Sequence, residues 1–72
     1  MVEVMIDAEF ITLGQFLKLV DVIDSGGAAK FFLQEEKVIV NDQEENRRGR
    51  KLYENDRIEI IGFGKYVIKL NH

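Results

Sequence analysis

Four of the ten cationic side chains of this 72-residue chain lie within six consecutive residues, NRRGRK at positions 46–51. Three of them are arginines, whose planar guanidinium groups match pairs of phosphate oxygens, and Gly49 has no side chain to block close approach. Such a loop can lie along a sugar–phosphate backbone. The alternative is a solubilising loop whose cations pair with nearby carboxylates, those of Glu44, Glu45 and Glu54. Residue types alone leave the two interpretations open.

A second candidate is SGGAAKF, residues 25–31. Glycine costs about 0.8–1 kcal/mol relative to alanine in a helix interior, so Gly26 and Gly27 in a first helical turn need a reason. Either their free N–H groups bind an anion that can come close, or they form a tight turn between packed helices, and the two explanations are compatible. Phe31, beside Lys30, either stacks on an unpaired base or widens the core face, which is the interpretation that the sequence favours.

Residues suited to catalysis or metal binding are scarce. The chain has no cysteine, and its one histidine, His72, is the last residue, where chains usually fray. The usual general base and metal ligands are therefore missing. The carboxylate pairs at 35–36 and 44–45 are sequence neighbours that point in different directions, and GFGK at 62–65 lacks the spacing of a phosphate-binding loop. We expect no enzyme, no small-molecule substrate, and no metal or other cofactor.

Two helices are predicted to position these residues. An apolar stripe at helical spacing runs over residues 13–20, and Thr12 can cap the N-terminus of that helix. Asp24 and Ser25 are possible caps for a second helix, GGAAKFFLQEE, in which Lys30, Gln34 and Lys37 share one face.

Strands are predicted from alternating or short apolar runs at 2–6, 38–40, 57–60 and 66–70, with a two-residue hairpin turn at 41–42. Together the elements predict one α+β domain over residues 1–72, with two N-terminal helices packed on one face of a small, mostly antiparallel sheet. The residues expected in one core are Phe16, Leu17, Ala29, Phe32, Leu33, Val38, Val40 and Ile58.

The formal net charge of -3 does not by itself favour a nucleic-acid partner, although the distribution of charge matters more than the sum. The sequence shows neither a signal peptide nor the ~18 apolar residues that span a bilayer, so we expect a cytoplasmic monomer with no membrane partner. Exposed cation pairs contribute only about 0–1 kcal/mol each, so we expect the loop arginines to be almost dispensable for folding.

The ordered motifs FLKLVDVIDSGGAAKFFLQEEKVIVND and RRGRKLYENDRIEI resemble the S-four domain, a small RNA-binding module named after a small-subunit ribosomal protein. The resemblance covers about residues 11–61, and SGGAAKFF and RRGRKL are similar to the stand-alone bacterial YaaA-like group. The positions that carry it are Leu13, Leu17, Ser25, Ala29, Lys30, Val38, Ile39, Val40, Asn41, Asp56 and Ile58.

The resemblance implies the αL-motif fold and the binding of structured RNA, often ribosomal RNA, without a cofactor. It implies that the second helix and the loops near it face the RNA, in assembly of the large ribosomal subunit or in translation-related quality control. The residues then expected to contact RNA, with the cations on one face, are Ser25, Gly26, Gly27, Lys30, Phe31, Lys37, Asn41, Arg47, Arg48, Arg50 and Lys51.

The chain departs from the family pattern at several positions. Thr12 stands where many members have arginine, and Glu36, Asp42 and Asn55 stand where turn glycines are usual. If those turns need a positive φ, Asn and Asp tolerate it better than Glu.

Two functions from other classes compete with RNA binding. The first is a protein-interaction module whose acidic edges bind a basic ribosomal or other protein. The second is a ubiquitin-like sulfur carrier, but such carriers need a C-terminal Gly-Gly and this chain ends KLNH, so we do not expect one.

Overall fold

The computed structural model describes residues 1–71, and His72 lies outside the described residues. The elements in chain order are β1 (Val2–Ile6), β2 (Phe10–Thr12), α1 (Leu13–Leu19), a 3₁₀ turn η1 (Gly26–Ala28), α2 (Ala29–Glu35), β3 (Val38–Val40), β4 (Gln43–Glu44), β5 (Lys51–Tyr53), β6 (Arg57–Ile60) and β7 (Gly64–Leu70). The predicted α+β class and its mostly antiparallel sheet are confirmed. The description of the helices as N-terminal is not confirmed, because β1, which was predicted at 2–6, and β2 precede them.

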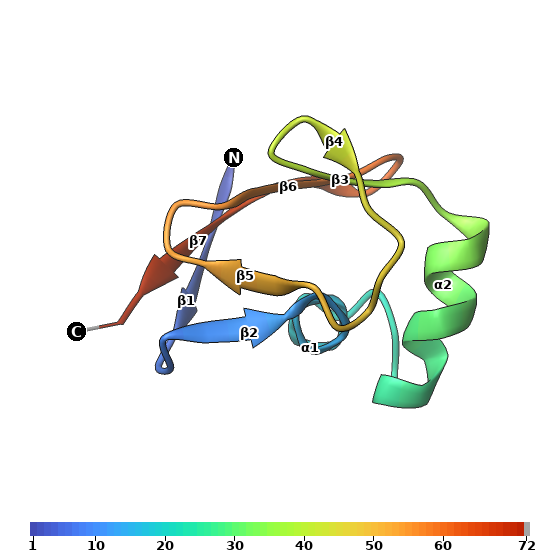
Figure 1. The fold of residues 1–72 in the computed structure, drawn as a ribbon, viewed down its shortest axis with the longest axis horizontal. Helices are drawn as coiled ribbons and strands as arrows, with labels where there is room; N and C mark the ends of the chain where they lie inside the picture. The colour runs from blue at the N-terminus through green and yellow to red at the C-terminus, as the bar shows by residue number, and fades with distance from the viewer. Residues whose placement is uncertain (72) are drawn as a thin grey trace.

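The strands form two sheets (Figure 1). The larger has the order β1-β7-β6-β3-β4, and only its β1–β7 pair is parallel. The smaller is an antiparallel ribbon of β2 and β5, with Ile11 opposite Leu52. Figure 1 shows this ribbon beside α1, while α2 stands at one end of the molecule. The β2–β5 pairing was not foreseen, because a three-residue strand that runs directly into a helix has too short a pattern to be recognised.

Helix α1 begins where the sequence predicts. The Thr12 hydroxyl accepts from the Gln15 N–H at 3.2 Å, and the Gln15 side-chain oxygen accepts from the Thr12 N–H at 2.9 Å. This reciprocal pair is a capping box, which satisfies two backbone donors at the helix start. No helix among residues 1–71 has the length and apolarity that crossing a membrane requires.

Helix α2 is shorter than predicted. The glycines form the 3₁₀ turn, and the α-helix starts only at Ala29, because glycine is a poor helix former. Ser25 occupies the N-cap position of that turn without a side-chain hydrogen bond. The helix ends at Glu35, so Lys37 lies in the connection to β3 and does not continue the face that Lys30 shares with Gln34.

Seven of the eight predicted core residues are buried together, and Phe32 is the exception. Its side chain is half-buried, with its ring 5.6 Å from that of Phe63 on the β6–β7 turn. The largest fully buried side chain is Phe16, whose ring meets Tyr66 edge-on. The core is therefore centred on α1 and the strands, and Phe32 closes one edge of it.

Left-handed backbone occurs where asparagine and aspartate were expected to tolerate it. Asn41 and Asp42 have φ values of 50° and 72° and form the predicted two-residue β3–β4 hairpin. Asn55 has φ 71°, as expected, and Asp21 at 64° was not foreseen. Glu36 has φ -115°, so its position does not need the positive φ that glutamate would tolerate poorly.

We expect Asn55→Gly to change the free energy of unfolding by less than about 0.5 kcal/mol and Asn55→Val to lower it by about 1–2 kcal/mol. The reason is that a β-branched side chain clashes with its own backbone at φ 71°. Urea denaturation of the purified proteins measures both effects. Glu54→Val, one residue earlier and not in the left-handed region, is the matched control, and equal stability of all variants would contradict the assignment of strain to Asn55.

Candidate nucleic-acid interface

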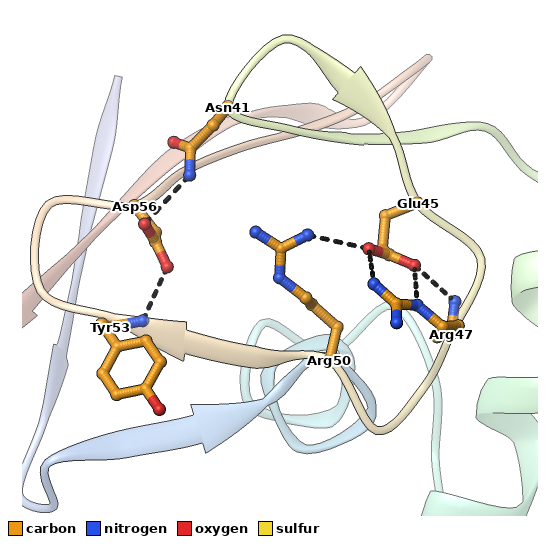
Figure 2. Close-up of polar contacts among 6 residues, drawn as sticks. All are labelled: Asn41, Glu45, Arg47, Arg50, Tyr53 and Asp56. Atoms are coloured by element: carbon orange, nitrogen blue, oxygen red, sulfur yellow. Dashed lines mark hydrogen bonds and ion pairs between the residues drawn. The ribbon is translucent and has the colours of Figure 1, made fainter.

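The arginine loop is held by one carboxylate, that of Glu45 (Figure 2). The Arg47 side chain donates to both its oxygens, from Nε at 2.9 Å and from Nη2 at 3.1 Å, and the Arg47 backbone N–H donates as well. Arg50 donates from Nη1 at 2.8 Å. These three residues, here called the Glu45 clamp, use only part of the arginines' donor capacity, because each guanidinium carries five N–H groups.

Glu45 is ionised because of the clamp. Only 7% of its surface is exposed, and burial alone would raise the pKa of a carboxyl group. The side-chain hydrogen bond from Arg47 outweighs that effect and, with the bond from Arg50, lowers the pKa of Glu45 from 4.5 to about 2. One negative charge is thus shared by two cations, so the clamp as a whole remains positive.

The same loop is docked on the start of α1 by its backbone. The N–H groups of Leu13 and Gly14 donate to the carbonyl oxygens of Arg50 and Arg48, both at 2.8 Å. The first N–H groups of a helix have no partner within it, so the loop supplies what α1 lacks. A Cβ at Gly14 would lie 3.4 Å from the Arg48 oxygen and 3.5 Å from the Ala29 Cβ, which are ordinary contact distances, so the loop, α1 and α2 meet at this residue without requiring a glycine. The sequence carries no local signal for this docking, because the bonds join residues that are distant in the chain.

A surface hollow joins the loop to α2. Its lining residues are Lys30, Leu33, Gln34, Glu44, Asn46 and Arg48. Neither Lys30 nor Arg48 forms a salt bridge with any residue in 1–71, although Glu44 lies close enough to line the same space. The structure therefore brings these two cations together across the hollow, here called the Lys30–Arg48 hollow.

Two other predicted positions already have partners within the protein. The Lys51 ammonium lies 4.8 Å from the centre of the Phe10 ring, on the outward side of the β2–β5 ribbon. The Asn41 side chain donates to Asp56 at 3.0 Å and accepts from the Arg57 N–H at 2.9 Å. Asp56 in turn accepts from the Tyr53 N–H at 2.7 Å (Figure 2). Asn41 thus joins the β3–β4 turn to the start of β6.

The start of α2 is open. A Cβ on Gly26 would meet nothing within 4 Å, and one on Gly27 only the Ser25 hydroxyl at 4.0 Å. Neither glycine has a positive φ. Neither backbone conformation nor packing therefore requires glycine at these two positions. Phe31 is 67% exposed, so the interpretation that it widens the core is wrong.

The expectation that the loop arginines are almost dispensable for folding conflicts with this geometry. Arg47 and Arg50 compensate a buried charge, which would be costly alone. Arg48 is different, because only its backbone holds the loop. Among residues 1–71 no three His, Cys, Asp or Glu side chains gather as a metal site would require.

We expect Glu45→Gln to lower the free energy of unfolding at pH 7 by about 3 kcal/mol, since a pKa shift from 4.5 to about 2 is worth ~1.4 kcal/mol per unit. The matched control is Glu44→Gln, which removes an exposed neighbouring charge and should change stability by less than about 0.5 kcal/mol.

The pH dependence has a definite sign. Folding lowers the pKa of Glu45, so its contribution is complete above about pH 4.5 and is lost as the pH falls towards 2. Urea denaturation at a series of pH values should show wild type and Glu45→Gln converging in stability near pH 2. A difference that stays constant down to that pH would mean that the ionised carboxylate does not hold the loop.

Comparison with known proteins agrees with the resemblance carried by the motifs. The sequence matches the S4 domain family over residues 4–69. The "Probable ribosome maturation protein RlbA" of Bacillus subtilis (strain 168) is 65% identical over 63 residues, which cover 88% of this chain and 89% of that protein. No solved structure matches. The chain therefore belongs to the S4 domain family, the S-four family of the sequence analysis.

Proposed function

We propose that this protein is a non-enzymatic RNA-binding factor that contacts structured ribosomal RNA in the cytoplasm during maturation of the large ribosomal subunit. Membership of the S4 domain family and 65% identity to a protein named as a probable ribosome maturation protein support the proposal. The observation that carries it is the Lys30–Arg48 hollow, where two cations without salt bridges in the described chain converge from α2 and the arginine loop.

Within the Glu45 clamp, the carboxylate fixes the side chains of Arg47 and Arg50 before the RNA binds. A free arginine side chain loses rotamer entropy when it binds a phosphate, whereas Arg47 and Arg50 are already oriented by the carboxylate. Their remaining N–H groups can donate to phosphate oxygens while Glu45 stays bonded. On this proposal Glu45 positions the arginines of the RNA site, although its own charge has the same sign as that of the RNA.

The other proposed contacts lie around this centre. Lys51 adds a cation on β5. The proposed contact surface also includes the start of α2, with Ser25, Gly26, Gly27 and Phe31. Lys37 follows α2 and is exposed. The side chain of Asn41 is hydrogen-bonded to Asp56 and Arg57. We therefore propose that Asn41 shapes the turn beside the RNA and does not contact a base.

The net charge of -3 is compatible with this site because several acidic side chains have partners inside the protein. Glu45 serves the clamp, Asp42 pairs with Arg57 at 3.3 Å, and Asp56 organises the turn that ends β5. Unpaired acids elsewhere on the surface would repel a phosphate backbone. On this proposal they orient the RNA towards the cationic side.

We expect Lys30→Gln and Arg48→Gln each to weaken binding to ribosomal RNA fragments several-fold and to flatten the salt dependence. Each lost phosphate contact should reduce the slope of log K against log salt by about 0.7–0.9, because fewer counterions are released. Fluorescence anisotropy titrations at several salt concentrations measure the slope. Folding should be unchanged, because neither side chain forms a salt bridge in residues 1–71.

The matched control is Lys65→Gln, which removes the same charge from the β7 strand beside a different hollow. It should leave the slope as in the wild type. If Lys30→Gln and Arg48→Gln also behave as wild type, and both still sediment with ribosomal particles, then RNA is not bound here and the acidic protein-interaction module becomes the better explanation.

We expect Gly27→Ala to be neutral or to stabilise the fold by up to about 1 kcal/mol, because the added Cβ has open space and alanine is the better helix former. It should nevertheless weaken RNA binding, because the methyl group occupies the space of an approaching phosphate. Thermal melts and the same anisotropy titration give the two readouts.

Gly62→Ala is the opposite control. Gly62 has φ 88° on the β6–β7 turn, so alanine there should destabilise the fold and leave the RNA affinity of the folded protein unchanged. Unchanged RNA binding by Gly27→Ala would remove the start of α2 from the proposed phosphate site.

A further inference from the structure

Phe31 is the most exposed residue of α2 that has no polar group. Its side chain is 67% exposed, whereas Ala29 and Leu33 are buried and Phe32 packs against Phe63. With ~100° between successive helical residues, Phe31 points almost directly away from the core. The fold therefore gains little from a phenylalanine at this position.

A single exposed apolar residue is common on protein surfaces, so a binding role for Phe31 depends on what surrounds it. Lys30 precedes it and lines the hollow that also contains Arg48. Glu35 lies on the other side of Phe31, about 40° further around the helix, so the cationic flank is the one towards the arginine loop.

The start of α2 leaves room around the ring. Helical side chains lean towards the N-terminus, which for Phe31 is the direction of the 3₁₀ turn that contains Gly27. Gly27 carries no side chain, and the space above it is open as far as the Ser25 hydroxyl. A flat ligand can therefore approach the ring face while its anionic part reaches Lys30.

We propose that Phe31 stacks on an unpaired base whose phosphate is held by Lys30 and Arg48, so that the preferred RNA is a helix interrupted by an unpaired nucleotide. In a continuous A-form helix the bases are stacked on one another and only phosphates and sugars face a protein surface, whereas unpaired bases stack readily on aromatic side chains. The inference rests on the proposed function and specifies its ligand.

The test compares two RNA probes, a continuous duplex and the same duplex with one unpaired 2-aminopurine, whose fluorescence is quenched by stacking. Wild type should bind the interrupted duplex about 10-fold more tightly, within the range that base–aromatic stacking supplies, and should quench the probe. Phe31→Leu should abolish the preference and the quenching while leaving affinity for the continuous duplex and its salt slope unchanged. Phe31→Tyr should keep both.

The matched control is Phe63→Leu, which removes another half-exposed ring from the β6–β7 turn and should behave as wild type. Equal affinity of wild type for the two duplexes, or a preference that survives in Phe31→Leu, overturns the inference while leaving the proposed RNA function in place. Failure to bind either duplex overturns the proposed function itself. If Phe31→Leu binds both RNAs as wild type does but no longer sediments with ribosomal particles, the ring docks on a protein and the inference is also wrong.

Discussion

The shape of the candidate interface depends on the carboxylate of Glu45. Residues 46–50 form no helix or strand and have a single turn bond, from the Arg50 N–H to the Arg47 carbonyl at 3.1 Å. A buried charge without partners would be destabilising. Bonds from Arg47 and Arg50 to Glu45 offset that cost and fix the segment at the same time. An acid in a cationic loop therefore orders the loop, in addition to reducing its charge.

The loop is also a structural part of α1. Its carbonyl oxygens complete the hydrogen bonds of the Leu13 and Gly14 N–H groups, and the loop, α1 and α2 meet around Gly14. As a result Arg48 of the loop faces Lys30 of α2 across the Lys30–Arg48 hollow. In a domain of 72 residues with little surplus core, this arrangement lets the same contacts stabilise the fold and shape the surface.

The acidic residues serve different purposes in different places. Glu45, Asp42 and Asp56 bond to cations or backbone groups and hold turns and the loop in position. Lys30 and Arg48, by contrast, have no salt-bridge partner within residues 1–71. Net charge is thus a poor guide to this protein, because part of the negative charge has partners inside the protein, whereas Lys30 and Arg48 meet at one surface hollow.

The sequence by itself determined the features that depend only on interactions between residues close together in the chain. Apolar alternation located most strands, Thr12 marked the start of α1, and Asn41–Asp42 specified a tight hairpin because these residues tolerate left-handed backbone. Each of these features follows from a residue and its near neighbours in the chain. The order and spacing of the motifs over residues 11–61 also sufficed to indicate the family.

Only the tertiary structure decided which charges are free. Glu44, Glu45 and Glu54 were equivalent partners for the arginines by sequence. The Glu45 N–H donates to the Val38 carbonyl at 2.8 Å, which extends the β3–β4 pairing by one residue and sets Glu45 on the inward side with Val38. The exposure of Phe31, the short α2 and the β2–β5 ribbon were likewise set by packing between distant segments, which no local pattern records.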